Sequence, residues 1–191
     1  LRTPDLVTEA VRQNGLALEF IDKKIRTLEI VMDAIKQNGL ALQYVKPESR
    51  TPEMMIEAMR QNGLALQYVN RRYIMPAMPL AIILEAMRQN GLALQYVNKN
   101  IMSPEIMLEA VRQNGSSIRY IERKMWAEEI ILEAVRHDGL ILRFVRNDEM
   151  TPSIILEALK QNPRALEYVA KKTRRLDEIK QIIEQYCTAR N

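Results

Sequence analysis

The sequence is poor in the residues that most often carry chemistry or cross-links, with one cysteine and one histidine among 191 residues. The single Cys187 excludes a disulfide within the chain and is typical of a protein in a reducing compartment. The single His137 makes no metal site by itself. No apolar run approaches the roughly 18 residues that a membrane-spanning helix needs, and no signal peptide is recognisable. These absences favour a cytoplasmic protein.

Glycine is also scarce, and all six glycines stand at the same place in a repeated unit. The thirteen residues of Glu57–Val69 recur letter for letter at Glu85–Val97. The Asn or Asp before the glycine position recurs at intervals of 24, 24, 28, 24, 24 and 24 residues, at Asn14, Asn38, Asn62, Asn90, Asn114, Asp138 and Asn162. The chain is therefore predicted to consist of seven 24-residue repeats over residues 1–172, with an insertion at 70–80.

Each repeat begins with signals for one short helix. In the third repeat Thr51 is a helix N-cap, Pro52 suits the first helical position, and Glu53 lies beside the positive helix end. The pattern predicts a helix of about ten residues. It should end at Asn-Gly, where glycine adopts the left-handed conformation. The following residues, Leu64–Val69, predict a second helix of one to two turns, 3₁₀ in part.

The apolar residues of the first helix cover an arc of about 200° on a helical wheel. An arc this wide is typical of a helix that packs between two neighbours, and such units are stable only in rows. The sequence therefore predicts an all-α solenoid of seven short helix-turn-helix repeats, closed by a C-terminal capping helix over 173–191. Because the chain begins at Leu1, with Thr3 and Pro4 matching the start of a later repeat, we expect it to be part of a longer protein.

The repeat T-P-E-x-x-x-E-A-[VM]-R-Q-N-G-x-A-L-x-Y-V resembles the 24-residue repeats of the bacterial family catalogued as domain of unknown function 4116. The resemblance covers Thr3 to about Lys172. The chain departs from the pattern at Ser116-Ser117, at His137-Asp138, at Asn162-Pro163 and in the insertion. The resemblance implies a repeat array within a larger bacterial protein, and proteins of this kind include candidate secreted effectors of intracellular pathogens. It implies no activity.

No group of residues predicts catalysis. Cys187 has no partner that would make it a nucleophile, and His137 stands on the polar side of a helix where other repeats have glutamine. The acid and base that recur in every repeat, such as Glu57 and Arg60, are three residues apart and so form a weak ion pair on one helical face. We therefore predict no enzyme, no catalytic residue, no metal site and no cofactor.

One aromatic residue recurs in each repeat, on the apolar side of the second helix. The members of this aromatic column are Phe20, Tyr44, Tyr68, Tyr96, Tyr120, Phe144 and Tyr168. Because phenylalanine replaces tyrosine twice, we expect the column to lie in the core rather than to stack on nucleic-acid bases. Most of the methionines also occupy apolar positions and are expected to fill gaps in the core.

Positive charge is concentrated in the joints between repeats, although the formal net charge is only +4. The residues of this predicted basic edge are Lys23, Lys24, Lys99, Arg123, Lys124, Lys171, Lys172, Arg174 and Arg175. A basic edge fits phosphate, nucleic acid or anionic lipid. Lysine and arginine in loops also serve simply to keep a repeat protein in solution.

Partner-binding residues are expected where the repeats differ and on the polar side of the first helices. The insertion is either a binding loop or a tolerated bulge. Ser116 and Ser117 replace apolar residues and Trp126 lies in a joint, so these three predict a local pocket or groove. The predicted partner-binding residues are Arg71, Arg72, Tyr73, Met75, Met78, Arg88, Arg112, Ser116, Ser117, Trp126 and Arg136.

The sequence thus favours a non-catalytic repeat scaffold that mediates protein-protein interaction, with the identity of the partner left open. The alternative is a phosphate-, nucleic-acid- or anionic-lipid-binding module that uses the basic edge. Since no cap is visible before the first repeat, self-association through the N-terminal repeat is also predicted. The expected location is the cytoplasm, or a host cell if the protein is a secreted effector.

Overall fold

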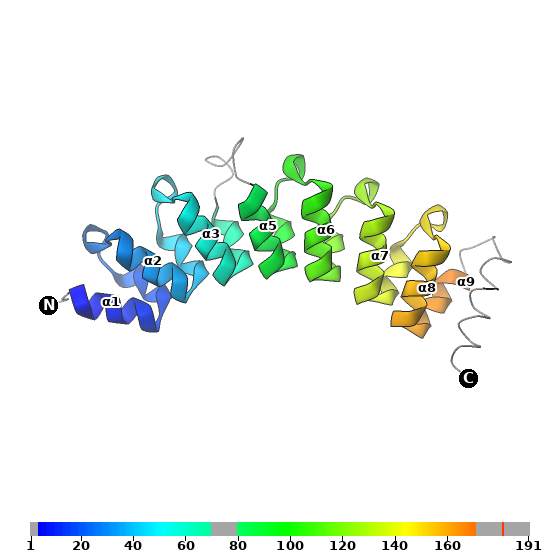
Figure 1. Ribbon diagram of the computed structural model, residues 1–191, viewed down its shortest axis with the longest axis horizontal. Helices are drawn as coiled ribbons and strands as arrows, with labels where there is room; N and C mark the ends of the chain where they lie inside the picture. The colour runs from blue at the N-terminus through cyan, green and yellow to red at the C-terminus, as the bar shows by residue number, and fades with distance from the viewer. Residues whose placement is uncertain (1–3, 70–79, 171–180, 182–191) are drawn as a thin grey trace. The chain divides into compact units, whose positions relative to one another are not determined.

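A computed structural model describes residues 4–69, 80–170 and 181 of the chain. The chain forms two compact units, Leu1–Gln113 and Asn114–Asn191. Every regular element among the described residues is a helix, which confirms the predicted all-α solenoid (Figure 1). Within each unit, the α-helices of successive repeats pack side by side.

The α-helices follow the predicted spacing of the repeats. The first unit contains α1 (Pro4–Gln13), α2 (Leu28–Gln37), α3 (Pro52–Gln61), α5 (Leu80–Gln89) and α6 (Pro104–Gln113). The second unit contains α7 (Glu128–His137), α8 (Pro152–Gln161) and the short α9 (Leu166–Ala170). Each helix from α1 to α8 is ten residues long, so the predicted helix length is confirmed.

Six-residue 3₁₀ helices follow the α-helices, at Gly15–Phe20, Gly39–Tyr44, Gly63–Tyr68, Gly91–Tyr96, Gly115–Tyr120 and Gly139–Phe144. These second helices are 3₁₀ throughout, whereas the sequence predicted 3₁₀ geometry only in part. Three-residue 3₁₀ turns, which the sequence did not predict, occupy the joints at Lys23–Ile25, Pro47–Ser49, Lys99–Ile101, Arg123–Met125 and Asn147–Glu149. The last repeat begins its second helix with the 3₁₀ turn Pro163–Ala165, which leads into α9.

The predicted start signals act as helix caps. The side-chain oxygen of Thr51 accepts a hydrogen bond from the backbone N–H of Met54, and Pro52 occupies the first turn of α3. The hydroxyl of Thr151 caps α8 in the same way through the N–H of Ile154. Since the first N–H groups of a helix have no partner within it, these caps fix where each repeat begins.

The glycines are required for close packing between repeats, and the predicted left-handed conformation was wrong. At Gly15, Gly39, Gly63, Gly115 and Gly139 the φ angle lies outside the left-handed range. A Cβ added at Gly39 would lie 2.2 Å from the carbonyl oxygen of Ala58 in the next repeat. Only glycine allows this approach, because any side chain would collide with the neighbouring backbone.

Asparagine and glutamine in the Gln-Asn-Gly stretch also have structural roles. The side chain of Asn62 accepts a hydrogen bond from the N–H of Leu64, so asparagine ends the α-helix and caps the 3₁₀ helix. Gln37 joins two repeats: its Oε1 accepts from the N–H of Gly15 at 2.6 Å and its Nε2 donates to the carbonyl of Gln13 at 3.2 Å. Gln161 makes the equivalent pair of bonds in the second unit.

The core contains the apolar residues of both helix types, but the aromatic column lies outside it. Ile35, Leu42 and Met59 are fully buried, and Met59 confirms the expected gap-filling role of methionine. By contrast Phe20 is 71% exposed, Phe144 is 56% exposed, and the five tyrosines of the column are only half-buried, so the prediction that the column lies in the core was wrong. The backbone is extended at the residue that follows each six-residue 3₁₀ helix, and there a Val or Ile enters the core instead.

The predicted insertion at 70–80 and the predicted capping helix at 173–191 lie, except for Leu80 and Gln181, outside the described residues. Leu80 begins α5 and is exposed, and Gln181 is helical and exposed. None of the helices in the described part of the chain combines the length and the apolar character that a membrane span requires.

Candidate functional site

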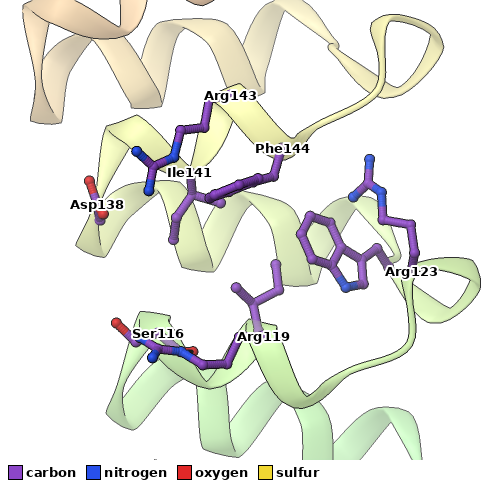
Figure 2. Close-up of a pocket in the computed structure, with 9 residues that line it drawn as sticks. Ser116, Arg119, Arg123, Asp138, Ile141, Arg143 and Phe144 are labelled. Atoms are coloured by element: carbon purple, nitrogen blue, oxygen red, sulfur yellow. Dashed lines mark hydrogen bonds between the residues drawn. The ribbon is translucent and has the colours of Figure 1, made fainter.

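A pocket of about 620 Å³ lies within the second unit (Figure 2). It is lined by Ser116, Ile118, Arg119, Arg123, Trp126, Asp138, Ile141, Arg143 and Phe144. One wall is the 3₁₀ helix Gly115–Tyr120, and the opposite wall is the next 3₁₀ helix, Gly139–Phe144, with its cap Asp138. The pocket is therefore built between two consecutive repeats of the same unit.

Several lining residues differ from their counterparts in the other repeats. Ser116 stands where Leu16, Leu40, Leu64 and Leu92 occur, and Ile141 stands where alanine is usual. Arg119 and Arg143 occupy the place of Gln43, Gln67 and Gln95. Because the backbone framework is the same in each repeat, these substitutions are what distinguish this pocket from the other joints.

Trp126 occupies a position that holds arginine in the first two repeats. Arg26 Nε donates to the carbonyl of Ile21 at 3.0 Å, and Arg26 Nη1 donates to the carbonyl of Tyr44 in the next repeat at 2.8 Å. Trp126 Nε1 makes the first of these bonds, to Ile121 O at 3.2 Å. Indole has a single N–H, so Trp126 does not make the second bond, the one that joins two repeats.

Arg50 shows how arginine at this position bonds two repeats together. Its Nε donates to the carbonyl of Val45 at 2.9 Å, and its Nη1 donates to the carbonyl of Tyr68. Partial burial lowers the pKa of Arg50 from its usual value. The guanidinium thus serves as a structural bridge at this joint and is directed at carbonyls instead of at a ligand.

Arg123 lies at one end of the pocket and is partly buried. Its Nη2 forms an ion pair with Glu149 at 2.5 Å, and its guanidinium carbon lies 3.9 Å from the centre of the Trp126 ring. Its Nη1 is buried and has no hydrogen-bond partner among the described residues. Glu149 also binds Arg146 Nη2 at 2.8 Å, so the two arginines share this carboxylate.

Arg119 and Arg143 extend along the two walls. Arg119 Nε donates to Ser116 O at 2.9 Å, as Gln67 Nε2 donates to Leu64 O in the third repeat. The Arg143 guanidinium carbon lies 4.5 Å from the centre of the exposed Phe144 ring. Figure 2 shows both arginine side chains running toward the end of the pocket where Asp138 and Ser116 lie.

The structure brings two of the three residues of the predicted local pocket together, Ser116 and Trp126. Ser117 instead is fully buried behind the wall, and its hydroxyl has no hydrogen-bond partner among the described residues. Arg119, Arg143 and Phe144 were not predicted as pocket residues. The two arginines were detectable, because they replace glutamine, but Phe144 was assigned to the core.

Two of the three predicted partner-binding arginines of the α-helices, Arg88 and Arg136, take part in ion pairs between repeats. Arg88 pairs with Glu109 at 3.2 Å, and Arg136 pairs with Glu157 at 3.5 Å. The hydrogen bond from Lys160 is the main reason that the pKa of Glu157 is lowered. Arg112 is exposed. The acid and base columns therefore stabilise the stack across repeats as well as within one helix.

Some residues of the predicted basic edge take part in ion pairs. Lys23, Lys24, Lys99 and Lys124 are all exposed, and Lys124 also forms an ion pair with Glu122 at 2.9 Å. Arg123 belongs to the pocket. The other predicted site residues, Arg71, Arg72, Tyr73, Met75, Met78, Lys171, Lys172, Arg174 and Arg175, lie outside the described part of the chain.

The described residues contain no group of three or more histidine, cysteine or acidic side chains that would hold a metal ion. Searches of curated proteins and of solved structures found no match. A family model, Domain of unknown function (DUF4116), matches three times, at residues 3–50, 81–126 and 128–174. Because these matches cover well over half of the chain and agree with the helical repeats, the chain belongs to the DUF4116 repeat family.

Proposed function

We propose that this chain is a non-catalytic repeat scaffold that binds another protein, and that the second-unit pocket receives a segment of that partner. One observation carries the proposal: residues that differ between repeats gather around this pocket. The residues that stay the same are used elsewhere, in the core, in the caps and in contacts between repeats.

The composition of the pocket supports a protein partner. Arginine, tryptophan and other aromatic residues are enriched where proteins bind one another, and a few of them usually carry most of the binding energy. Here two arginine–aromatic pairs, Arg123 with Trp126 and Arg143 with Phe144, lie at the same pocket. A phenylalanine ring that is 56% exposed gains stability when a partner covers it.

The second candidate function is binding of phosphate, nucleic acid or anionic lipid along the basic edge. The exposed Lys23, Lys24 and Lys99 favour it. However, Arg26 and Arg50 direct their guanidinium groups at backbone carbonyls, and Lys124 is paired with Glu122. Fewer charges therefore remain for phosphate than the sequence suggests, so this function ranks second. The location of the protein, in the cytoplasm or in a host cell, remains a prediction.

A closed-pocket variant tests the proposed function. It combines Ser116→Leu, Ser117→Ala and Trp126→Arg, which restore the residues found in the second repeat at Leu40, Ala41 and Arg50. Because these residues already fit the same framework, the variant should remain folded. Wild-type and variant proteins are used as baits in the same cell lysate, and the retained proteins are quantified by mass spectrometry.

We expect at least one protein to be retained by the wild type and lost from the closed-pocket variant. Identical sets of retained proteins on both baits would contradict the proposed site. A set that is released from both baits at moderate salt, and is lost on charge reversal at Lys23 and Lys24, would favour the basic edge instead.

A further inference from the structure

We propose that the second-unit pocket recognises an acidic segment of the partner, with a carboxylate side chain at one end of the pocket and an apolar side chain at the other. This inference rests on the proposed function, because it specifies the chemistry of the segment that the pocket binds. It follows from the different character of the two ends of the pocket.

The carboxylate end is defined by Arg119 and Arg143. These residues lie on opposite walls, and both side chains run toward the end marked by Ser116 and Asp138 (Figure 2). Both arginines are exposed, so a ligand reaches them without moving the core. A guanidinium binds a carboxylate through paired N–H donors, which gives strength and direction to the contact.

The local charge balance favours a singly charged group. Three of the charged lining residues are arginines, Arg119, Arg123 and Arg143, and one is a carboxylate, Asp138. Arg123 is paired with Glu149, so the lining has a small excess of positive charge. A side-chain carboxylate, with one negative charge, suits this excess, whereas a phosphate monoester carries about −1.5 to −2 charges at neutral pH and is repelled more strongly by Asp138.

The rest of the pocket lining is mainly apolar, and Trp126, which packs against Arg123, marks the end away from Ser116 and Asp138. Trp126 and Phe144 lie on this pocket together with Ile118 and Ile141. The guanidinium carbon of Arg123 lies over the Trp126 ring, 3.9 Å from its centre, and this cation–π contact helps to hold the indole in place. A Leu, Ile, Met or Phe side chain of a ligand would cover these surfaces and remove them from water.

The size and opening of the pocket fit a short peptide segment. Its volume of about 620 Å³ lies within the range of roughly 300–1,000 Å³ that is usual for ligand pockets. Asp138 uses Oδ1 to accept the N–H of Leu140, and its carboxylate also suits the backbone N–H groups of a peptide. A peptide therefore supplies all three kinds of group that the pocket can bind: carboxylate, apolar side chain and N–H.

The test begins with a phage-displayed library of random peptides selected on the full chain. A selected peptide is then titrated into the protein while the fluorescence of Trp126 is followed. Since Trp126 is the only tryptophan and lines the pocket, its emission reports binding at this site. We expect the selected peptides to share an Asp or Glu close to a Leu, Ile, Met or Phe.

The double variant Arg119→Gln with Arg143→Gln isolates the role of charge. Glutamine occupies the same place in three repeats, where its Nε2 donates to the carbonyl three residues earlier, so the fold should be kept. We expect the affinity for the peptide to fall about 10- to 100-fold. Amidation of the peptide's acidic side chain should weaken binding to the wild type similarly, with little further effect on the double variant.

The matched control is Arg12→Gln with Arg60→Gln, which removes the same charge from exposed ion pairs of the first unit and should leave the affinity unchanged. Binding at Trp126 without an acidic preference would overturn this inference and leave the proposed function standing. Tighter binding of a phosphoserine peptide would overturn the choice of carboxylate. The closed-pocket variant lacks Trp126, so its affinity for the peptide is measured by isothermal titration calorimetry. If no peptide is selected, or if this variant binds as tightly as the wild type, both proposals fail.

Discussion

The joint between the first two repeats and the joint that forms the second-unit pocket share a backbone plan but differ in size and chemistry. The pocket at the first joint measures about 250 Å³, against about 620 Å³ in the second unit. The smaller pocket is lined by Lys23, Arg26, Val31, Tyr44, Val45, Lys46 and Ser49. In repeat register, Lys23, Arg26 and Tyr44 correspond to Arg123, Trp126 and Phe144.

The difference lies in polar bonds between the repeats. At the first joint Arg26 donates to the carbonyl of Tyr44 at 2.8 Å, and the Tyr44 hydroxyl donates to Glu19 Oε2 at 3.0 Å. In the second unit tryptophan, phenylalanine and arginine replace these three residues, so neither bond can form. A repeat joint is thus converted from a closed contact into an open pocket by losing its own polar bonds.

The largest expected effect comes from breaking the stacking that both joints share. Gly39→Ala places a Cβ 2.2 Å from the carbonyl oxygen of Ala58. The carbonyl oxygen is part of the backbone and the Cβ is held by it, so neither atom can turn aside. The repeats must therefore shift apart, and we expect a loss of about 3 kcal/mol in the free energy of unfolding.

Urea titration followed by circular dichroism measures this loss. The control is Gln67→Ala, an exposed substitution that should change stability by less than about 0.5 kcal/mol. If the Gly39→Ala midpoint matched that of the control, close approach of the backbones would not be the reason for glycine at this position.

The second prediction places tryptophan, the residue found at Trp126 in the second unit, at the equivalent position of the first joint. Arg26→Trp keeps a donor for Ile21 O but loses the bond to Tyr44 O, which leaves a partly buried carbonyl without that partner. We expect a loss of about 2 kcal/mol and a wider first joint. The comparison variant Arg12→Gln removes an exposed ion pair with Asp33 and should cost about 0.5 kcal/mol or less. Equal losses in urea would mean that the cross-repeat bond of Arg26 adds nothing.

The repeat length and the helix boundaries were predictable because their signals are local. Thr51 and Pro52 identify a helix start from two adjacent letters, and the Asn-Gly pair identifies its end. The role of the glycine was not predictable in this way. Gly39 is needed because of Ala58, which is distant in sequence and becomes a neighbour only when the repeats stack. The pair Asn-Gly marks a helix end whether or not the glycine adopts the left-handed conformation, so the letters alone do not tell the two cases apart.

The candidate site was predictable only in part. Ser116 and Trp126 break the repeat pattern, and a comparison of the repeats at the position of Arg119 would have added both wall arginines. The exposed Phe144 was beyond sequence reasoning, because the position looks apolar in every repeat. Whether its ring is buried depends on where the chain leaves the 3₁₀ helix, and here Val145 takes the buried place.

The third prediction concerns the buried hydroxyl of Ser117, which lies beneath the pocket wall. Ser117 is fully buried with an unpartnered hydroxyl at a position where alanine is usual. Ser117→Ala removes that group at almost constant volume and should stabilise the protein by about 1 kcal/mol. Ser116→Ala, at the pocket surface, is the control and should stay within about 0.5 kcal/mol of the wild type. A destabilised Ser117→Ala protein would show that the hydroxyl has a bonding partner.

The smallest expected effect is a change in the pKa of Tyr44, a residue of the first joint that phenylalanine replaces in the second-unit pocket. The hydrogen bond to Glu19 is the main reason that the pKa of Tyr44 is raised, because ionisation would end the donation and place a phenolate beside a carboxylate. Glu19→Gln should therefore lower the pKa of Tyr44 toward its usual value of about 10. Nuclear magnetic resonance of ¹³C-labelled tyrosine follows this titration.

The sign of the linkage follows from the raised pKa of Tyr44. The folded state holds the phenolic proton more tightly than the unfolded state, so the stabilisation is present below a pH of about 10 and is lost as the pH rises through the folded pKa. Glu105→Gln, which removes an equal charge elsewhere in the first unit, should leave the Tyr44 titration unchanged. Equal shifts in the two variants would assign the raised pKa to the overall charge and not to the hydrogen bond that closes the first joint.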